Sequence, residues 1–356
     1  MHHPKFRTLF SWLCLLLVIL IILIPLISIF TYYDFRLNLK LTDYVSSIIY
    51  FTFYQSLLSA FLSIIAGSLF AYLLNTYKNY YLINLIAQTQ SILFVLPTII
   101  TVFGILSFYG NFFNIYGLTG ILIGHVVLNT PIVSHIIYQT LNDISPSEKL
   151  LSRQMGLGKF SSFLASEWPI IKRNIPSLFV LVTFICFVSF TPILILGGSP
   201  KYSTLEVSIY YSVIFSNDFG TALNLLIFQL IICTIIYFIF FKNFKSENFF
   251  IDEHRKVKTY FNFTIFNFLE LIILLLIAVS IFMPIIFVII KGLNFEIIST
   301  IQSFYLWESI YNTFIICLFS GIISTVLVYN LLILTKKRTK ISELSLIHIS
   351  EPTRPY

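Results

Sequence analysis

The pair Gly158-Lys159 is the first feature of this sequence that could do chemistry, since a Gly-Lys pair closes a phosphate-binding loop. That loop requires the pattern G-x-x-x-x-G-K-[ST]. Arg153 stands where the first glycine belongs, and Phe160 follows the lysine. No strand-helix-strand pattern surrounds the pair either. The sequence therefore argues against a nucleotide site on this chain.

The histidines and cysteines do not form a recognisable catalytic or metal-binding set. His125 and His135 are ten residues apart, so they are not an i, i+4 metal pair on one helix face. The cysteines stand singly inside apolar runs, without CxxC spacing, and we interpret them as small hydrophobic residues; they are Cys14, Cys186, Cys233 and Cys317. We interpret His125 as a hydrogen-bonded residue of a helix bundle. We expect neither catalysis nor a bound metal or cofactor on this chain.

The composition is that of an integral membrane protein. Hydrophobic residues make up 58% of the 356 residues and charged residues 10%, whereas soluble domains average about 25% charged residues. Apolar runs of about 20 residues can each cross a bilayer. The sequence predicts an all-α polytopic bundle of about eight transmembrane helices, at 9–31, 47–74, 83–108, 118–139, 176–197, 220–241, 265–290 and 309–334.

The net charge of +7 indicates orientation rather than nucleic-acid binding. Lys and Arg fall almost entirely in alternate loops, as the positive-inside rule describes. The opposite loops hold only Arg36, Lys40, Lys201 and Lys291. We therefore expect a multi-pass protein of the bacterial inner membrane with a cytoplasmic N-terminus.

An internal repeat organises the chain. "YQSLLSAFLSIIAGSLFAYLLN" from Tyr54 is similar to "YNTFIICLFSGIISTVLVYNLL" from Tyr311, and "ILIPLISIF" around Pro25 is similar to "IFMPIIFVI" around Pro284. Helices seven and eight therefore repeat helices one and two. We expect a complete six-helix core at 1–242 and a polar cytoplasmic linker at 243–263. The start of a second core follows at 264–343, and the tail at 344–356 resembles a translated sequencing adapter.

The polar segment 145–169 forms the longest interruption of the first core. Ser145, Pro146 and Glu148 make a capping box that predicts a short helix, and Gly156 suits its end. Phe160 and Phe163 then begin a second short amphipathic helix, and Trp168-Pro169 indicates the return to the membrane. The sequence predicts two short helices that project from the bundle.

This segment resembles the EAA motif of the permease subunits of type I ATP-binding-cassette importers. The motif's first three positions fall on Leu150, Leu151 and Ser152, followed by Arg153, and its glycine and final proline fall on Gly156 and Pro169. The usual glutamate is Leu150 here, with Glu148 close by. The repeat is similar to that of fused permeases, in which one chain carries two cores.

The resemblance implies a chain that does no chemistry itself. A cytoplasmic ATPase dimer, which binds ATP and Mg, would receive the loop, and a periplasmic substrate-binding protein would deliver a small-molecule substrate. Phe160 and Phe163 would be the docking anchors; alternatively, they fold back on the bundle or lie among lipid headgroups. Two stretches, 124–157 and 196–213, look most like thiamine importer permeases, which suggests thiamine or its phosphates. Ferric-iron permeases come second, and an ATP-independent transporter or channel is the alternative of another class.

Polar residues inside the predicted helices could line a pathway, although small polar residues also join membrane helices. The candidates are Gln55, Ser59, Ser63, Asn129, Thr130, Ser189 and Thr191. The centres of the helices hold essentially no ionisable residue, which argues against an ion-coupled transporter. Pro97, Pro131 and Pro192 are expected to kink or interrupt their helices.

Overall fold

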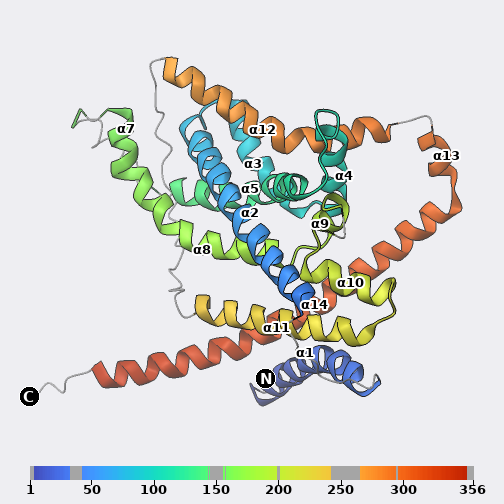
Figure 1. Cartoon of the computed structure of the whole chain (residues 1–356). Helices are drawn as coiled ribbons and strands as arrows, with labels where there is room; N and C mark the ends of the chain where they lie inside the picture. The colour runs from blue at the N-terminus through green and yellow to red at the C-terminus, as the bar shows by residue number, and fades with distance from the viewer. Residues whose placement is uncertain are drawn as a thin grey trace, which may run out of the picture. The chain divides into compact units, whose positions relative to one another are not determined.

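A computed structural model gives the fold of the chain and describes residues 4–32, 42–142, 144, 155–156, 158–198, 201–241, 265–293 and 296–350. These residues form helices without any strand, which confirms the predicted helical membrane bundle (Figure 1). Six helices in the described ranges are long and apolar enough to cross a membrane, namely those within 43–76, 118–142, 160–187, 219–238, 268–292 and 304–333.

The helices group into two units, 37–293 and 1–36 with 294–356. The first unit contains α2 (Asp43–Thr76), α3 (Tyr81–Val95), α4 (Thr98–Tyr109), α5 (Leu118–Asn142), α7 (Lys159–Ser162), the π-helical turn η1 (Phe163–Glu167), α8 (Trp168–Phe187), α9 (Thr191–Leu196), α10 (Leu205–Ile214), α11 (Phe219–Phe241) and α12 (Ile265–Gly292). The second contains α1 (Pro4–Tyr32), α13 (Glu296–Gln302) and α14 (Phe304–Ser350). The linker predicted at 243–263 lies outside the described residues.

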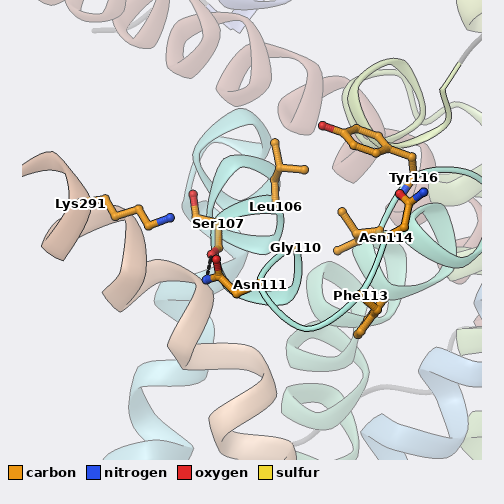
Figure 2. Close-up of a pocket in the computed structure, with 9 residues that line it drawn as sticks. Leu106, Ser107, Gly110, Asn111, Phe113, Asn114, Tyr116 and Lys291 are labelled. Atoms are coloured by element: carbon orange, nitrogen blue, oxygen red, sulfur yellow. Dashed lines mark hydrogen bonds between the residues drawn. The ribbon is translucent and has the colours of Figure 1, made fainter.

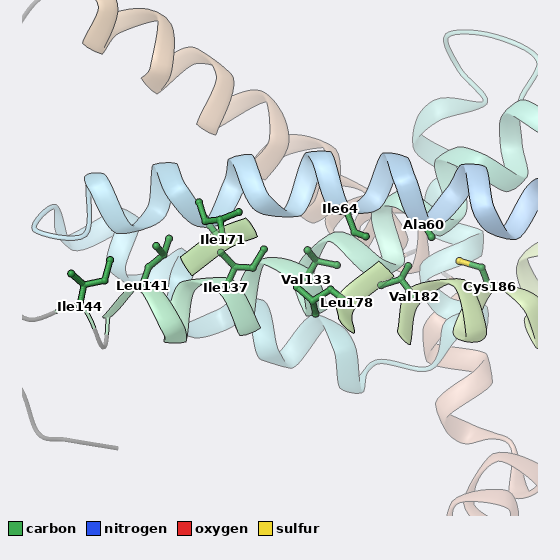
Figure 3. Packing of buried hydrophobic residues seen from close by; sticks show 11 residues of the cluster. Ala60, Ile64, Val133, Ile137, Leu141, Ile144, Ile171, Leu178, Val182 and Cys186 are labelled. Atoms are coloured by element: carbon green, nitrogen blue, oxygen red, sulfur yellow. The ribbon is translucent and has the colours of Figure 1, made fainter. Parts of the chain in front are cut away.

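Helix α2 is the centre of the larger unit, where it packs along α5 and α8. Thr42 caps its first turn by accepting a hydrogen bond from the Val45 amide at 3.3 Å. The buried cluster between the three helices extends along α2 from Ile144 to Cys186 (Figure 3). Gly67 lets α2 approach α5 closely, since a Cβ on it would lie 2.6 Å from the Cβ of Val133. Small residues allow this approach between membrane helices.

The span predicted at 83–108 is two helices, which corrects that prediction. Helix α3 ends at Val95, Leu96 is extended with φ −63° and ψ 140°, and α4 begins after Pro97. A residue before proline disfavours the α conformation because the proline ring crowds its backbone. The expected interruption at Pro97 is therefore confirmed. Pro192 likewise stands in the first turn of α9, whereas Pro131 lies inside α5.

The span predicted at 176–197 begins much earlier and ends sooner. Helix runs without a break from Lys159 through η1 into α8, which ends at Phe187. Pro169 does not stop it, because the π-helical turn pairs the Trp168 amide with the Phe163 carbonyl just before the proline. The second projecting helix is thus the start of a membrane helix, not a separate element.

Helices α1 and α12, which the repeat predicts to be counterparts, contact different partners. Helix α12 packs against α4 and α2. Gly104 of α4 lies against the backbone of α12, because its Cβ would meet the Pro284 carbonyl oxygen at 2.3 Å. Helix α1 packs against α14 in the other unit, where Ser11 Oγ donates to Asn330 Oδ1 at 3.4 Å.

Gly67→Ala should destabilise the bundle, because the added methyl group would overlap Val133. Overpacking of this kind costs about 1–3 kcal/mol. The midpoint of thermal unfolding of the purified chain in detergent measures the effect. Gly321→Ala on α14 is the matched control, since nothing lies within 4 Å of its Cβ. Equal midpoints for the two variants would contradict the close approach of α2 and α5.

Candidate functional site

A line of polar side chains, all buried except the partly buried Ser189, joins α2, α5, the end of α8 and the break after it. We call it the polar seam; its members are Gln55, Ser59, Ser63, His125, Asn129, Cys186 and Ser189. His125 is its centre: Nδ1 lies 3.0 Å from Ser59 Oγ and Nε2 lies 3.0 Å from Ser189 Oγ. Ser63 Oγ donates to the His125 carbonyl at 3.5 Å. Both ring nitrogens therefore have partners on other elements, which confirms that His125 is a hydrogen-bonded residue of the bundle.

The second part of the polar seam lies around Cys186 at the end of α8. Gln55 donates through Nε2 to the Cys186 carbonyl at 3.0 Å, and Asn129 donates through Nδ2 to Cys186 Sγ at 3.2 Å. Gln55 Oε1 and Thr130 Oγ1 are buried and lack a hydrogen-bond partner within the described part of the chain. A buried polar atom without a partner costs about 1–3 kcal/mol, so these two atoms are unfavourable in this packing.

The structure thus brings most of the predicted pathway residues together in the polar seam. Thr130 is adjacent to it in sequence, and Thr191 begins α9 beyond the break. The hydrogen bonds of the polar seam join helices, as expected if these residues hold membrane helices together. Their role in translocation stays a prediction. Sequence reasoning did not include Cys186, because its carbonyl and sulfur act as acceptors only in this packing.

The chain leaves α5 and enters α7 at the same end of the bundle. We call this end, where Leu141, Ile144 and Ile171 lie, the loop end. Ile144 and Leu141 pack there with Ile171 of α8 in the central cluster (Figure 3). Gly156 has φ +67°, the left-handed conformation expected at the end of the first short helix. Of the motif positions, Glu148, Leu150, Leu151, Ser152 and Arg153 lie outside the described residues.

The two predicted anchors have different surroundings. The Phe163 ring meets the Tyr72 ring of α2 edge to face, with centroids 4.8 Å apart, and also packs beside Trp168. Phe163 packs against the central cluster. It therefore folds back on the bundle, as the alternative expected. Phe160 is 73% exposed. This exposure agrees with docking to a partner and equally with a place among lipid headgroups, since a candidate membrane span begins at Phe160.

The loop end of α2 also contacts α5 and α12. Lys78 Nζ donates to Asn75 Oδ1 at 3.1 Å and to Asn142 Oδ1 at 2.6 Å. The Tyr77 hydroxyl donates to Glu270 Oε2 at 2.8 Å. Burial, and then this bond to a carboxylate, raise the pKa of Tyr77, so its hydroxyl stays protonated as the donor. These contacts join residues up to 193 positions apart, which sequence periodicity does not reveal.

A pocket of about 390 Å³ lies at the opposite end of the bundle, between α4, the loop before α5 and the end of α12. Figure 2 shows Lys291 directed from α12 towards Ser107 and Asn111. None of the predicted pathway residues lines this pocket. Within the described residues, no group of His, Cys, Asp and Glu is suited to hold a metal ion.

Comparison with known proteins finds relatives among transport proteins. No protein-family model matches the chain. The chain is 28% identical over 318 residues to the thiamine transport system permease protein ThiP of Haemophilus influenzae, a match covering 83% of this chain and 57% of that protein. It is 29% identical over 313 residues to ThiP of Escherichia coli, covering 82% and 57%. The chain spans just over half the length of these curated relatives.

Phe163→Ala should lower the stability of the chain and Phe160→Ala should not. Phe163 packs against Tyr72, whereas Phe160 is mostly exposed. A fully buried Phe→Ala change costs about 3–5 kcal/mol, so about half of that is expected at the partly buried Phe163. Thermal unfolding of the two variants in detergent checks this. A larger loss for Phe160→Ala would mean that the roles of the two rings are reversed.

Proposed function

We propose that this chain is, or is part of, the permease subunit of an ATP-binding-cassette importer for thiamine or its phosphates in the bacterial inner membrane. The observation that carries the proposal is the similarity to thiamine transport permeases over more than four-fifths of the chain. The helical membrane bundle agrees with it. A ferric-iron importer is not favoured, because the relatives are named for thiamine.

In this proposal the energy comes from another subunit. A cytoplasmic ATPase dimer binds ATP and Mg, and no step of hydrolysis takes place on this chain. Phe160 enters a cleft of the ATPase, and the unbroken helix from Lys159 to Phe187 connects that contact with the membrane. Binding shifts a conformational equilibrium only through contacts that differ between its states, and an exposed ring on a stiff helix suits such a contact.

The polar seam is proposed as the part of the pathway that changes during transport. Ser189 lies in the break between α8 and α9, and its hydrogen bond to His125 spans 64 positions. Helix breaks of this kind absorb backbone rotation. A periplasmic substrate-binding protein would deliver the substrate at the end opposite the loop end. The cytoplasmic placement of the N-terminus and of the loop end rests on the Lys and Arg distribution.

Phe160→Asp should abolish association with the ATPase subunit and uptake, because a carboxylate would have to be desolvated in an apolar contact. Co-purification of the ATPase and uptake of labelled thiamine measure the two effects in the complete importer. Phe112→Asp is the matched control: Phe112 is 71% exposed, close to the 73% of Phe160, but lies in the loop at the opposite end. It should keep the ATPase.

The same preparation tests the class and the substrate. Uptake that continues without any ATPase would favour an ATP-independent transporter or channel. Excess unlabelled thiamine, or a thiamine phosphate, should suppress uptake of the labelled compound. Ferric complexes that compete where thiamine does not would overturn the substrate assignment and leave the transporter class intact.

A further inference from the structure

The loop end of α2 is held between two segments that are far apart in sequence. On one side the Tyr72 ring meets Phe163 of η1 with centroids 4.8 Å apart. Five residues later, the Tyr77 hydroxyl donates to Glu270 Oε2 of α12 at 2.8 Å. This short section of α2 therefore contacts both the segment that carries Phe160 and the beginning of α12.

The section between the two tyrosines is suited to transmit displacement. It is regular helix up to Thr76, and five residues of helix extend about 7.5 Å. Leu73, Leu74 and Tyr77 are buried in one cluster with Leu274 and other residues of α12. Close-packed interiors transmit strain rather than absorb it. Bonds to a carboxylate are roughly twice as strong as neutral ones, so the link to Glu270 should move with α2.

The Tyr77–Glu270 contact matters because of the repeat to which α12 belongs. The sequence around Pro284 repeats that around Pro25, which makes α12 the predicted first helix of the second copy. The Tyr77–Glu270 hydrogen bond therefore joins the copy that carries the described 158–167 segment to a helix of the other copy. The two copies of an importer have to change state together, and a contact of this kind serves that need.

We propose that residues 72–77, the end of α2 and its capping residue Tyr77, transmit movement of the Phe160-bearing segment to α12, and that the Tyr77–Glu270 hydrogen bond is the connection. Tyr77 and Glu270 are positioning residues in this account. The source of the movement rests on the proposed function, whereas the connection rests on the contacts of the described residues alone. Two experiments separate these parts.

The first experiment uses the purified chain without any partner. Hydrogen exchange of residues 265–274 reports on the first turns of α12. Phe163→Ala, or the milder Phe163→Leu, should speed exchange there, because it loosens the contact with Tyr72. In a Tyr77→Phe background the same change should add nothing, since the connection is already lost. An equal increase in both backgrounds, or none in the first, would overturn the proposal.

Tyr109→Phe is the matched control for this experiment. Its hydroxyl also donates to α12, at the Ser280 carbonyl and 3.1 Å, but from α4. Phe163→Ala should keep its full effect on α12 exchange in this background. Loss of the effect would mean that any weakened contact with α12 gives the same result, which would contradict a specific connection through Tyr77.

The second experiment uses the complete importer in lipid nanodiscs with its ATPase and substrate-binding protein. Tyr77→Phe and Glu270→Leu should each lower the ratio of receptor-stimulated to basal ATP hydrolysis by about fivefold, the lower range of allosteric coupling. The double variant should be no worse than either single one. Glu270→Gln should keep most of the ratio, because its amide oxygen still accepts from Tyr77.

The two proposals fail in different ways. A stimulated ratio that is unchanged in Tyr77→Phe and Glu270→Leu would refute transmission through this bond. A wild-type complex that neither binds an ATPase nor shows stimulated hydrolysis would refute the proposed function. The exchange experiment would then still decide whether residues 72–77 connect Phe163 to α12.

Discussion

The close packing of α2 against α5 and α8 is the contact on which the other features depend. Lipid tails are as apolar as leucine, so burial of apolar surface does little to join helices in a bilayer, and small residues with interhelical hydrogen bonds take its place. Gly67 and Ala60 provide the small surfaces, and His125 provides hydrogen bonds to two other elements. The same packing holds both ends of the loop, through Ile144 and Ile171. This packing therefore positions both the polar seam and the segment that carries Phe160.

Two phenylalanines three residues apart differ in what they contact. Phe163 packs against the bundle through Tyr72, and the side chain of Phe160, on the same continuous helix, is exposed. A partner that binds Phe160 therefore acts on an element already seated against α2. The π-helical turn at 163–167 keeps that element continuous with α8 in spite of Pro169. A break at the proline would have separated the proposed docking residue, Phe160, from the membrane helix.

Sequence reasoning succeeded where the signal is local. The apolar runs predict most membrane helices, and Pro97 predicts the interruption between α3 and α4, because both depend on a residue and its neighbours. It placed the start of the next membrane helix at 176, whereas the helix begins at Lys159 and continues through Pro169, since whether a proline stops a helix depends on how the preceding turn rearranges. It foresaw a hydrogen-bonded His125 but not its serine partners. The bond from Tyr77 to Glu270 was beyond its reach, because helices that are apolar on all sides give no indication of which face meets which neighbour.

The pairing of α1 with α14 has a consequence for how the protein is made. Ser11 and Asn330 are hydrogen-bonded although 319 positions separate them. At roughly 5–20 residues per second, a ribosome needs about 15–60 s to synthesise that length. During this time α1 has to remain in the lipid without the helix it will finally contact. The contact between the N-terminal helix and α14 therefore forms only after the helices between them have been synthesised.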